Sequence, residues 1–215
     1  MRPGYSRNSY NRRTSPKVIG GHVQRKNNHV KTAELSCVID RRSPYLGYQH
    51  VVSKRDIHDF IEIIPDWNKV SSGIKSIVLD SGGDDYDGCY THCYHENTGV
   101  IWLSAWQKDL WVELNEFYFA EHSWLFKILG VVSEKRTEIV CDKEEVFWIC
   151  YFTESQAKAF MLMHIFLHEL GHHVDKLRSK SKRRVRSGEP FAEQYSIRRF
   201  HEIWPMYVKK FGMPC

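Results

Sequence analysis

The stretch of sequence that decides the fold reads His168-Glu169-Leu170-Gly171-His172. On a helix, residues four apart lie one turn apart on the same face, so the two imidazoles can converge on one ion. Glu169 lies about a quarter-turn round the helix and can reach a water molecule instead. Gly171 puts minimal bulk between the histidines, which allows another element to approach closely. The spacing therefore predicts two histidine ligands of a zinc ion beside a general base.

The sequence before this motif predicts a long helix that carries it. Residues 153–156 read Thr-Glu-Ser-Gln and have the form of a capping box, in which Thr153 accepts a hydrogen bond from the Gln156 amide. Apolar residues then recur at helical spacing to about Leu177, so the motif falls in the second half of the helix. Residues 178–188 are basic and rich in serine, which indicates a connecting loop.

A carboxylate for a third ligand follows this loop. Residues 188–193 read Gly-Glu-Pro-Phe-Ala-Glu and predict the start of a last helix that runs toward Trp204-Pro205, with Glu189 and Glu193 on one face. Glu189 is the predicted ligand, and Glu193 can accept a hydrogen bond from the free ring nitrogen of a ligand histidine. If Glu189 is only a helix-start carboxylate favoured by the helix dipole, Glu193 is the substitute ligand.

The two motifs together resemble the gluzincin branch of zinc metallopeptidases, whose pattern is HExxH followed by ExxxD or a variant. The resemblance covers roughly residues 153–200, and it is closer to small cytosolic, bacterial-type members, such as the repressor-cleaving phage-type peptidases, than to large secreted enzymes. It implies one Zn²⁺ per chain, held by His168, His172 and Glu189. It also implies that Glu169 activates the zinc-bound water for hydrolysis of a peptide or protein. The chain departs from the commoner pattern in having Glu193 where an Asp is usual.

The same resemblance implies an edge strand that pairs with an extended peptide substrate. Its residues in this chain are Val100, Ile101, Trp102, Leu103 and Ser104. No residue that would stabilise the oxyanion is anchored in a motif, and His173, Tyr195 and His201 are the candidates. His164 lies one turn before His168, where we expect a core histidine or one that contacts a ligand.

The fold expected for residues 34–215 is α+β and zincin-like, with a small antiparallel sheet packed on the active-site helix and the following Glu-bearing helix. Turn residues separate three predicted strands, which suggest an antiparallel meander. Helical spacing predicts a further long helix after these strands. The predicted elements are a short helix over 56–64 ended by Pro65, strands over 74–80, 88–94 and 100–104, a helix over 106–129, and either a strand or a lead-in over 145–152.

Two segments concentrate the positive charge of this 215-residue chain, whose formal net charge is +5. Residues 1–33 contain no carboxylate and predict a flexible basic arm; residues 176–186 form a second basic run. Each is either solvated or contacts an acidic or nucleic-acid partner. The alternative to a peptidase is therefore a non-catalytic, zincin-fold regulatory or nucleic-acid-binding protein with structural zinc. The basic residues are Arg2, Arg7, Arg12, Arg13, Lys17, Arg25, Lys26 and Lys31, then Lys176, Arg178, Lys180, Lys182, Arg183, Arg184 and Arg186.

Apolar patterning predicts a cytoplasmic protein with no membrane partner. The start of the chain has no apolar stretch of signal-peptide length, and the longest apolar run, residues 160–167, is too short to cross a bilayer. The six cysteines are then expected to be reduced. Cys89, His92, Cys93 and His95 could suggest a second zinc site, but an extended backbone would point His92 away from the other three, which disfavours it.

Overall fold

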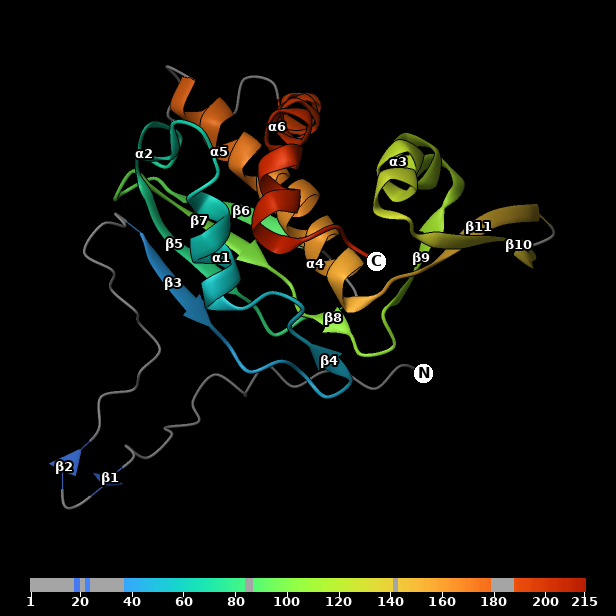
Figure 1. Ribbon diagram of the computed structural model, residues 1–215, viewed down its shortest axis with the longest axis horizontal. Helices are drawn as coiled ribbons and strands as arrows, with labels where there is room; N and C mark the ends of the chain where they lie inside the picture. The colour runs from blue at the N-terminus through green and yellow to red at the C-terminus, as the bar shows by residue number, and fades with distance from the viewer. Residues whose placement is uncertain (1–17, 20–21, 24–36, 84–86, 141–142, 179–187) are drawn as a thin grey trace.

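The computed structural model describes residues 18–19, 22–23, 37–83, 87–140, 143–178 and 188–215 (Figure 1). The basic arm lies almost entirely outside these residues, as does most of the 176–186 run. Within the arm, two short strands pair antiparallel, β1 (Val18–Ile19) and β2 (His22–Val23). The rest is a mixed α+β structure with small sheets.

A four-stranded mixed sheet in the order β3-β5-β7-β6 lies beneath the helices (Figure 1). The predicted strands are confirmed with small changes at their ends, but the antiparallel meander is wrong. Among the described strands, β6 pairs with β7 and not with β5, while β7 also pairs with β5 in parallel. The other parallel pair, β3 and β5, is joined through α1 and α2. The bounds are β3 (Val38–Arg41), α1 (Lys54–Ile61), α2 (Trp67–Val70), β5 (Ile74–Leu79), β6 (Gly88–Cys93) and β7 (Thr98–Leu103).

The prediction that residues 100–104 form the edge strand is wrong. Val100, Ile101, Trp102 and Leu103 belong to β7, which is hydrogen-bonded to β5 on one side and to β6 on the other, while Ser104 follows the strand. A strand whose two edges are both paired has no backbone groups left for a peptide. Among the described strands, the outermost on this side of the sheet is β6.

The long helix runs over the sheet in three parts: α4 (Glu154–Phe160), a π-helical segment η1 (Met161–Phe166) and α5 (Leu167–Arg178). The capping box at its start is confirmed, because Thr153 accepts from the Gln156 amide and the Gln156 side chain bonds back to Thr153. The π-helical segment was not predicted. All of its side chains are buried, so neighbouring elements enclose it.

The core between sheet and helices is apolar. Ile39, Ile77 and Ile101 stand opposite one another on adjacent strands, and each is completely buried. Phe60 of α1 contacts Phe166 of the long helix edge to face, with ring centroids 5.5 Å apart. Since both rings belong to the cluster that contains the three isoleucines, α1 and the long helix share this core.

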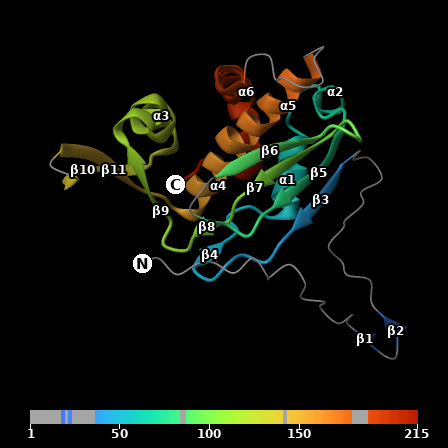
Figure 2. The ribbon, with the colours of Figure 1, turned by 180° about the vertical axis from the view of Figure 1, so that it is seen from behind.

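The last helix, α6 (Gly188–Phe211), packs along α5 (Figures 1 and 2). It continues beyond the predicted end at Pro205. Proline removes one backbone hydrogen bond and disfavours a helix interior. Here Tyr207 is buried and stacks on Trp204 and Phe211, with ring centroids 5.7 and 4.8 Å apart, which stabilises the last turns.

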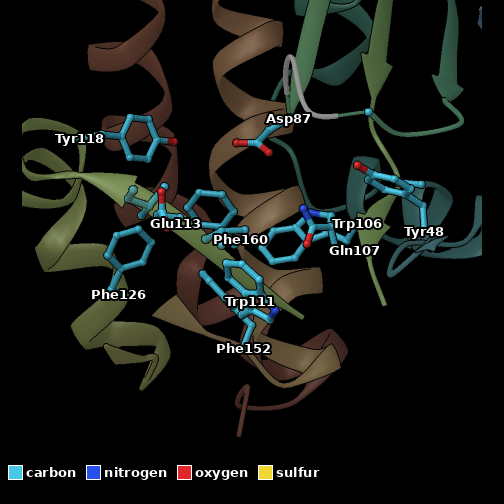
Figure 3. A pocket seen from close by; sticks show the side chains of 14 residues that line it. Tyr48, Asp87, Trp106, Gln107, Trp111, Glu113, Tyr118, Phe126, Phe152 and Phe160 are labelled. Atoms are coloured by element: carbon cyan, nitrogen blue, oxygen red, sulfur yellow. The ribbon is translucent and has the colours of Figure 1, made fainter. Parts of the chain in front are cut away.

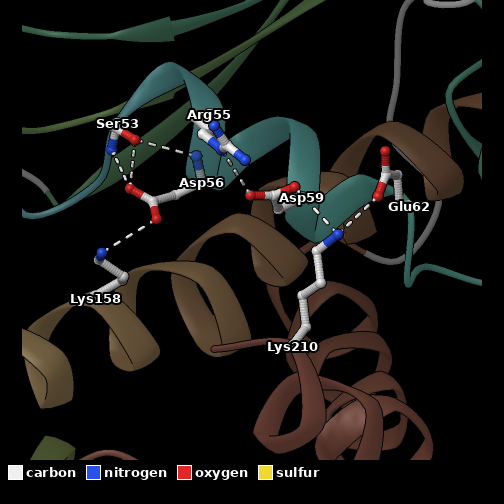
Figure 4. Close-up of polar contacts among 7 residues, drawn as sticks. All are labelled: Ser53, Arg55, Asp56, Asp59, Glu62, Lys158 and Lys210. Carbon is white, nitrogen blue, oxygen red and sulfur yellow. Dashed lines mark hydrogen bonds and ion pairs between the residues drawn. The ribbon is translucent and has the colours of Figure 1, made fainter. Parts of the chain in front are cut away.

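Polar contacts fix α1 against the two longer helices (Figure 4). Asp56 completes a capping box with Ser53 and also pairs with Lys158 of α4 at 3.1 Å. Lys210 of α6 pairs with Asp59 at 3.1 Å and with Glu62 at 2.9 Å. These partly exposed ion pairs set the orientation of the helices more than they add stability.

A smaller lobe of one helix and a three-stranded sheet lies at one end of the molecule (Figures 1 and 2). The predicted helix over 106–129 is wrong in its first part, up to residue 115. Residues 111–115 pair with β11 as a strand, and this pairing overrides an apolar pattern that also fits a helix. The helix begins after Asn115, whose side chain accepts from the Tyr118 amide. Residues 145–152 follow the strand alternative. The bounds in the lobe are β9 (Trp111–Asn115), α3 (Glu116–Leu129), β10 (Val132–Val140) and β11 (Lys143–Tyr151). Two further strands, β4 (Tyr48–Gln49) and β8 (Trp106–Gln107), pair with each other.

None of the helices in the described part of the chain is long and apolar enough to cross a membrane.

Candidate metal centre

His168, His172 and Glu189 come together where α5 meets the start of α6. The Nε2 atom of His168 lies 3.0 Å from Glu189 Oε2 and 3.1 Å from His172 Nε2, and His172 Nε2 lies 3.4 Å from Glu189 Oε1. One ligand atom from each residue therefore lies within 4.8 Å of the others. The structure brings together the three residues that the sequence predicts as zinc ligands.

The donor set fits a zinc ion. Ligand atoms about 2.1 Å from a tetrahedral zinc stand about 3.4 Å from one another, close to the separations here. Two imidazole nitrogens and a carboxylate oxygen that face each other are electron-rich, so a positive charge between them is stabilising. The pKa of His168 reflects this field: burial lowers it, but Glu193, Glu169 and Glu189 raise it more, to a value above its ordinary one.

Two of these side chains, His168 and Glu189, line an open pocket. Glu189 has 78% of its side chain exposed, while His168 and His172 keep 19% and 16%. The pocket has a volume of about 790 Å³, and Glu169 and Tyr118 also line it. A catalytic zinc site needs a position open to water and substrate, and this arrangement supplies one.

Glu169 lies beside the ligands but faces β6. Its residue exposure is 7%, and the backbone amide of Tyr90 donates a hydrogen bond to its carboxylate. Burial, together with the nearby Glu189 carboxylate, raises the pKa of Glu169 to about 7, against the opposing effect of His168. A carboxylate with a pKa near neutrality is suited to accept and return a proton.

Glu193 contacts His168 from the side away from the other ligands. Its Oε2 lies 3.2 Å from His168 Nδ1, which is the contact expected for a carboxylate that orients a ligand histidine. Its Oε1 lies 3.6 Å from Nε2 of His122, whose Nδ1 donates to the Tyr118 carbonyl at 2.9 Å. Burial alone would raise the pKa of Glu193, but the nearby His122 and the hydrogen bond with His168 hold it well below its usual range.

Gly171 lets the two helices approach closely, as the sequence predicts. A Cβ atom at this position would lie 2.8 Å from Ala192 Cα and 3.0 Å from the Ala192 carbonyl oxygen. Asp175 adds a second link, because its carboxylate accepts from the Gly188 amide at 3.0 Å. These contacts place the start of α6, and with it Glu189, over the histidines.

Gly171→Val is therefore expected to push α6 away from α5. The clash is with backbone, so we expect a loss of about 2 to 3 kcal/mol in unfolding free energy, together with weaker zinc binding. Urea denaturation and zinc titration measure both effects. Leu177→Ala, at an exposed position of the same helix, is the control and should change neither. Unchanged zinc affinity in a folded Gly171→Val protein would contradict this account of the helix contact.

His164 is buried behind the site, with 4% exposure, and its ring centroid lies 4.5 Å from that of His122. It belongs with His122 and Glu193 to a second group of side chains whose ligand atoms lie within 4.8 Å of one another. Burial, and then the nearby His122, lower the pKa of His164 to about 3. It is the core histidine that the sequence leads us to expect.

This lowered pKa predicts a loss of stability in acid. Below pH 6.5 the unfolded chain protonates His164, whereas the folded chain does not until about pH 3. The folded state then loses up to about 1.4 kcal/mol per pH unit as pH falls through this range. His164→Leu should remove that part of the slope in urea unfolding between pH 7 and 5, measured with a chelator present. An unchanged slope, equal to that of the exposed-site control His201→Leu, would be inconsistent with a neutral buried His164.

None of the three predicted oxyanion candidates lines the pocket of the metal centre. His173 is buried, with Nε2 donating to the Ser72 carbonyl and Nδ1 beside the Tyr90 hydroxyl. Tyr195 is buried beneath the α5–α6 contact, and the ring of His201 lies 5.3 Å from that of Trp124.

Tyr118 lines the pocket instead, from the first turns of α3. In the sequence it is only one aromatic residue in an apolar helical pattern, because its place depends on how the smaller lobe packs. His122, one turn later, was missed for the same reason.

The cysteine and histidine pattern at residues 89–95 forms no group of three converging ligand atoms within the described part of the chain. Cys89, Cys93 and His92 lie on β6, and His92 Nδ1 contacts the Tyr90 hydroxyl at 3.0 Å.

Comparison with known proteins adds no relative: no protein-family model matches the chain, and neither a curated protein nor a solved structure matches it.

Proposed function

We propose that this protein is a zinc-dependent metallopeptidase with a zincin-like fold. The observation that carries the proposal is the convergence of His168, His172 and Glu189, with the buried Glu169 carboxylate next to them. A structural zinc site has its coordination closed by protein ligands, usually cysteine and histidine. Three converging ligands, two of which line an open pocket, with a base of near-neutral pKa beside them, favour hydrolysis instead.

In the proposed hydrolysis, the zinc ion and the residues of the chain have separate roles. A zinc ion, when bound, lowers the pKa of water toward neutrality and polarises a carbonyl group. Glu169 accepts the proton from the attacking water and later delivers it to the leaving amine. Glu193 fixes the ring of His168 through Nδ1, so that Nε2 faces the ion.

The outer edge of β6 is the surface on which an extended peptide can add as a further strand. This edge runs past Glu169, whose carboxylate is bonded to the Tyr90 amide of β6. A peptide held there lies along the pocket that His168 and Glu189 line. β6 thereby takes the role that the sequence assigned to residues 100–104.

Tyr118 is our candidate for stabilising the oxyanion. It lines the same pocket, and burial, followed by the nearby Asp87 and Glu193 carboxylates, raises the pKa of its hydroxyl. The hydroxyl thus stays protonated at neutral pH and can donate a hydrogen bond to developing negative charge.

The proposal is tested by incubating the purified full-length protein with a proteome-derived peptide library. We expect cleavage with zinc, none after chelation, and recovery when zinc is returned. Mass spectrometry identifies the new termini. A zinc-loaded protein that cleaves no peptide would argue against peptidase activity while leaving the metal site intact.

A further inference from the structure

A second group of potential metal ligands lies beside the metal centre. His122 of α3, His164 of the π-helical segment and Glu193 of α6 each place one ligand atom within 4.8 Å of the others. The two histidines are 3% and 4% exposed, and all three side chains line the pocket of the metal centre. The group is therefore buried, but an ion can reach it through that pocket.

The hydrogen bond of His122 shows which ring nitrogen is free to bind an ion. Nδ1 lies 2.9 Å from the Tyr118 carbonyl oxygen, which can only accept, so Nδ1 carries the hydrogen. In the neutral ring the lone pair is then on Nε2, which lies 3.6 Å from Oε1 of Glu193. Two electron-rich atoms thus face each other beyond hydrogen-bond distance, and a cation between them is stabilising.

Glu193 divides its two carboxylate oxygens between the two groups. Oε2 lies 3.2 Å from Nδ1 of His168, whereas Oε1 is buried and has no hydrogen-bond partner among the described residues. Most buried polar atoms in proteins have a partner, and a bound ion is one of the usual reasons for an exception. Oε1 is therefore available to a second ion while Oε2 still orients His168.

The lining of the pocket attracts cations to this position. Its charged residues in the described part of the chain are acidic, and no lysine or arginine is among them. The acidic residues are Asp87, Glu121, Glu169, Glu189 and Glu193. A cavity lined by charges of one sign raises the local concentration of the opposite ion.

Tyr118 packs on His122, with ring centroids 4.0 Å apart. It also lines a neighbouring pocket of about 560 Å³, where Figure 3 shows its ring close to those of Phe126 and Phe160. None of the three potential ligands lines that second pocket. The pocket of the metal centre is thus the one that offers an ion access to them.

We propose that His122, His164 and Glu193 bind a second zinc ion beside the metal centre. Two imidazole nitrogens and a carboxylate oxygen are a donor set that suits zinc. An ion held by all three would join α3 of the smaller lobe to the long helix and to α6. The inference concerns metal binding and does not depend on peptidase activity.

This site should bind zinc more weakly than the metal centre does. Ligand atoms of a tetrahedral zinc stand about 3.4 Å apart, so a bound ion must draw these atoms together by at most about 1.4 Å. An ion already held by His168, His172 and Glu189 also repels a second one. We therefore expect the second ion to bind only when zinc is in excess, and to leave on dialysis against buffer.

Equilibrium dialysis of the full-length protein against rising zinc concentrations, followed by metal analysis, tests the second site. Wild-type protein should bind about one zinc per chain at low concentration and about two at higher concentration. His122→Phe keeps an aromatic ring but has no ligand nitrogen, so it should lose the second step and keep the first. His201→Phe, the same change at an exposed position, should keep both.

Two further measurements need no variant. The second step should raise the Tm, because the ion stabilises the folded state that holds its ligands together. In NMR spectra of the histidine rings, the resonances of His122 and His164 should shift during that step. These spectra decide the question if His122→Phe does not fold. One zinc per chain at every concentration, a second zinc retained by folded His122→Phe, or shifts confined to other histidines would overturn the inference and leave the metal centre intact.

Discussion

Glu169→Gln is expected to lower peptide hydrolysis by about 100- to 10,000-fold while the protein still binds zinc. Glutamine keeps the shape of the side chain but cannot accept a proton. Glu169 is not among the residues whose atoms converge on the ion position, so its loss should leave the metal in place. Measuring kcat/KM and zinc content on the same preparation separates the two effects.

Glu154→Gln is the matched control, since it makes the same chemical change at an exposed position in the first turn of the same long helix. It should alter neither activity nor zinc content. If the Glu169→Gln protein cleaved peptides at the wild-type rate, another group would have to accept the proton, and our assignment of the base would fail.

Replacing Glu189 with alanine is expected to weaken zinc binding more than replacing Glu193 does. Glu189 oxygens lie 3.0 and 3.4 Å from the Nε2 atoms of the two histidines, where a ligand must be. Glu193 contacts His168 through Nδ1, on the opposite side of the ring. Loss of such an orienting partner typically costs about 10- to 100-fold in metal affinity, so Glu193→Ala should fall in that range and Glu189→Ala beyond it.

Competition with a chromophoric chelator measures both affinities. Glu202→Ala, on an exposed part of the same helix, serves as the control and should bind zinc normally. The reverse order, with zinc lost in Glu193→Ala and retained in Glu189→Ala, would favour the alternative in which Glu193 is the third ligand.

The local features of the site were predictable because they depend on short-range geometry. The spacing of His168 and His172 sets both on one helical face, and the capping box at Thr153 fixes where that helix begins. Glu189 and Glu193 could be assigned as a pair for the same reason. Their distances from the histidines depend on the close contact between α5 and α6 at Gly171. The small size of this residue was the only feature of the sequence that indicated such a contact.

The errors arose where long-range pairing decides the structure. Strand content located β5, β6 and β7 but could not show that β7 would pair with both of the others. The edge of the sheet was therefore assigned to β7 and not to β6. In the same way, Trp111 and Leu114 fit a helical pattern, but pairing of β9 with β11 made that segment a strand.

That second error concealed Tyr118 and His122. In a helix running from residue 106, neither had a reason to face the metal centre. Once α3 begins after Asn115, its first turns bring both side chains toward Glu193. The π-helical segment before His168 could not be predicted either, because no residue pattern distinguishes it from an ordinary helix.

Metal analysis of the purified protein tests the central claim most directly. Wild-type protein, dialysed against zinc and then against buffer, should retain about one zinc per chain, and His172→Ala prepared in parallel should lose it. Wild-type protein that holds no zinc, or His172→Ala protein that retains a full complement, would contradict the metal centre on which the proposed function depends.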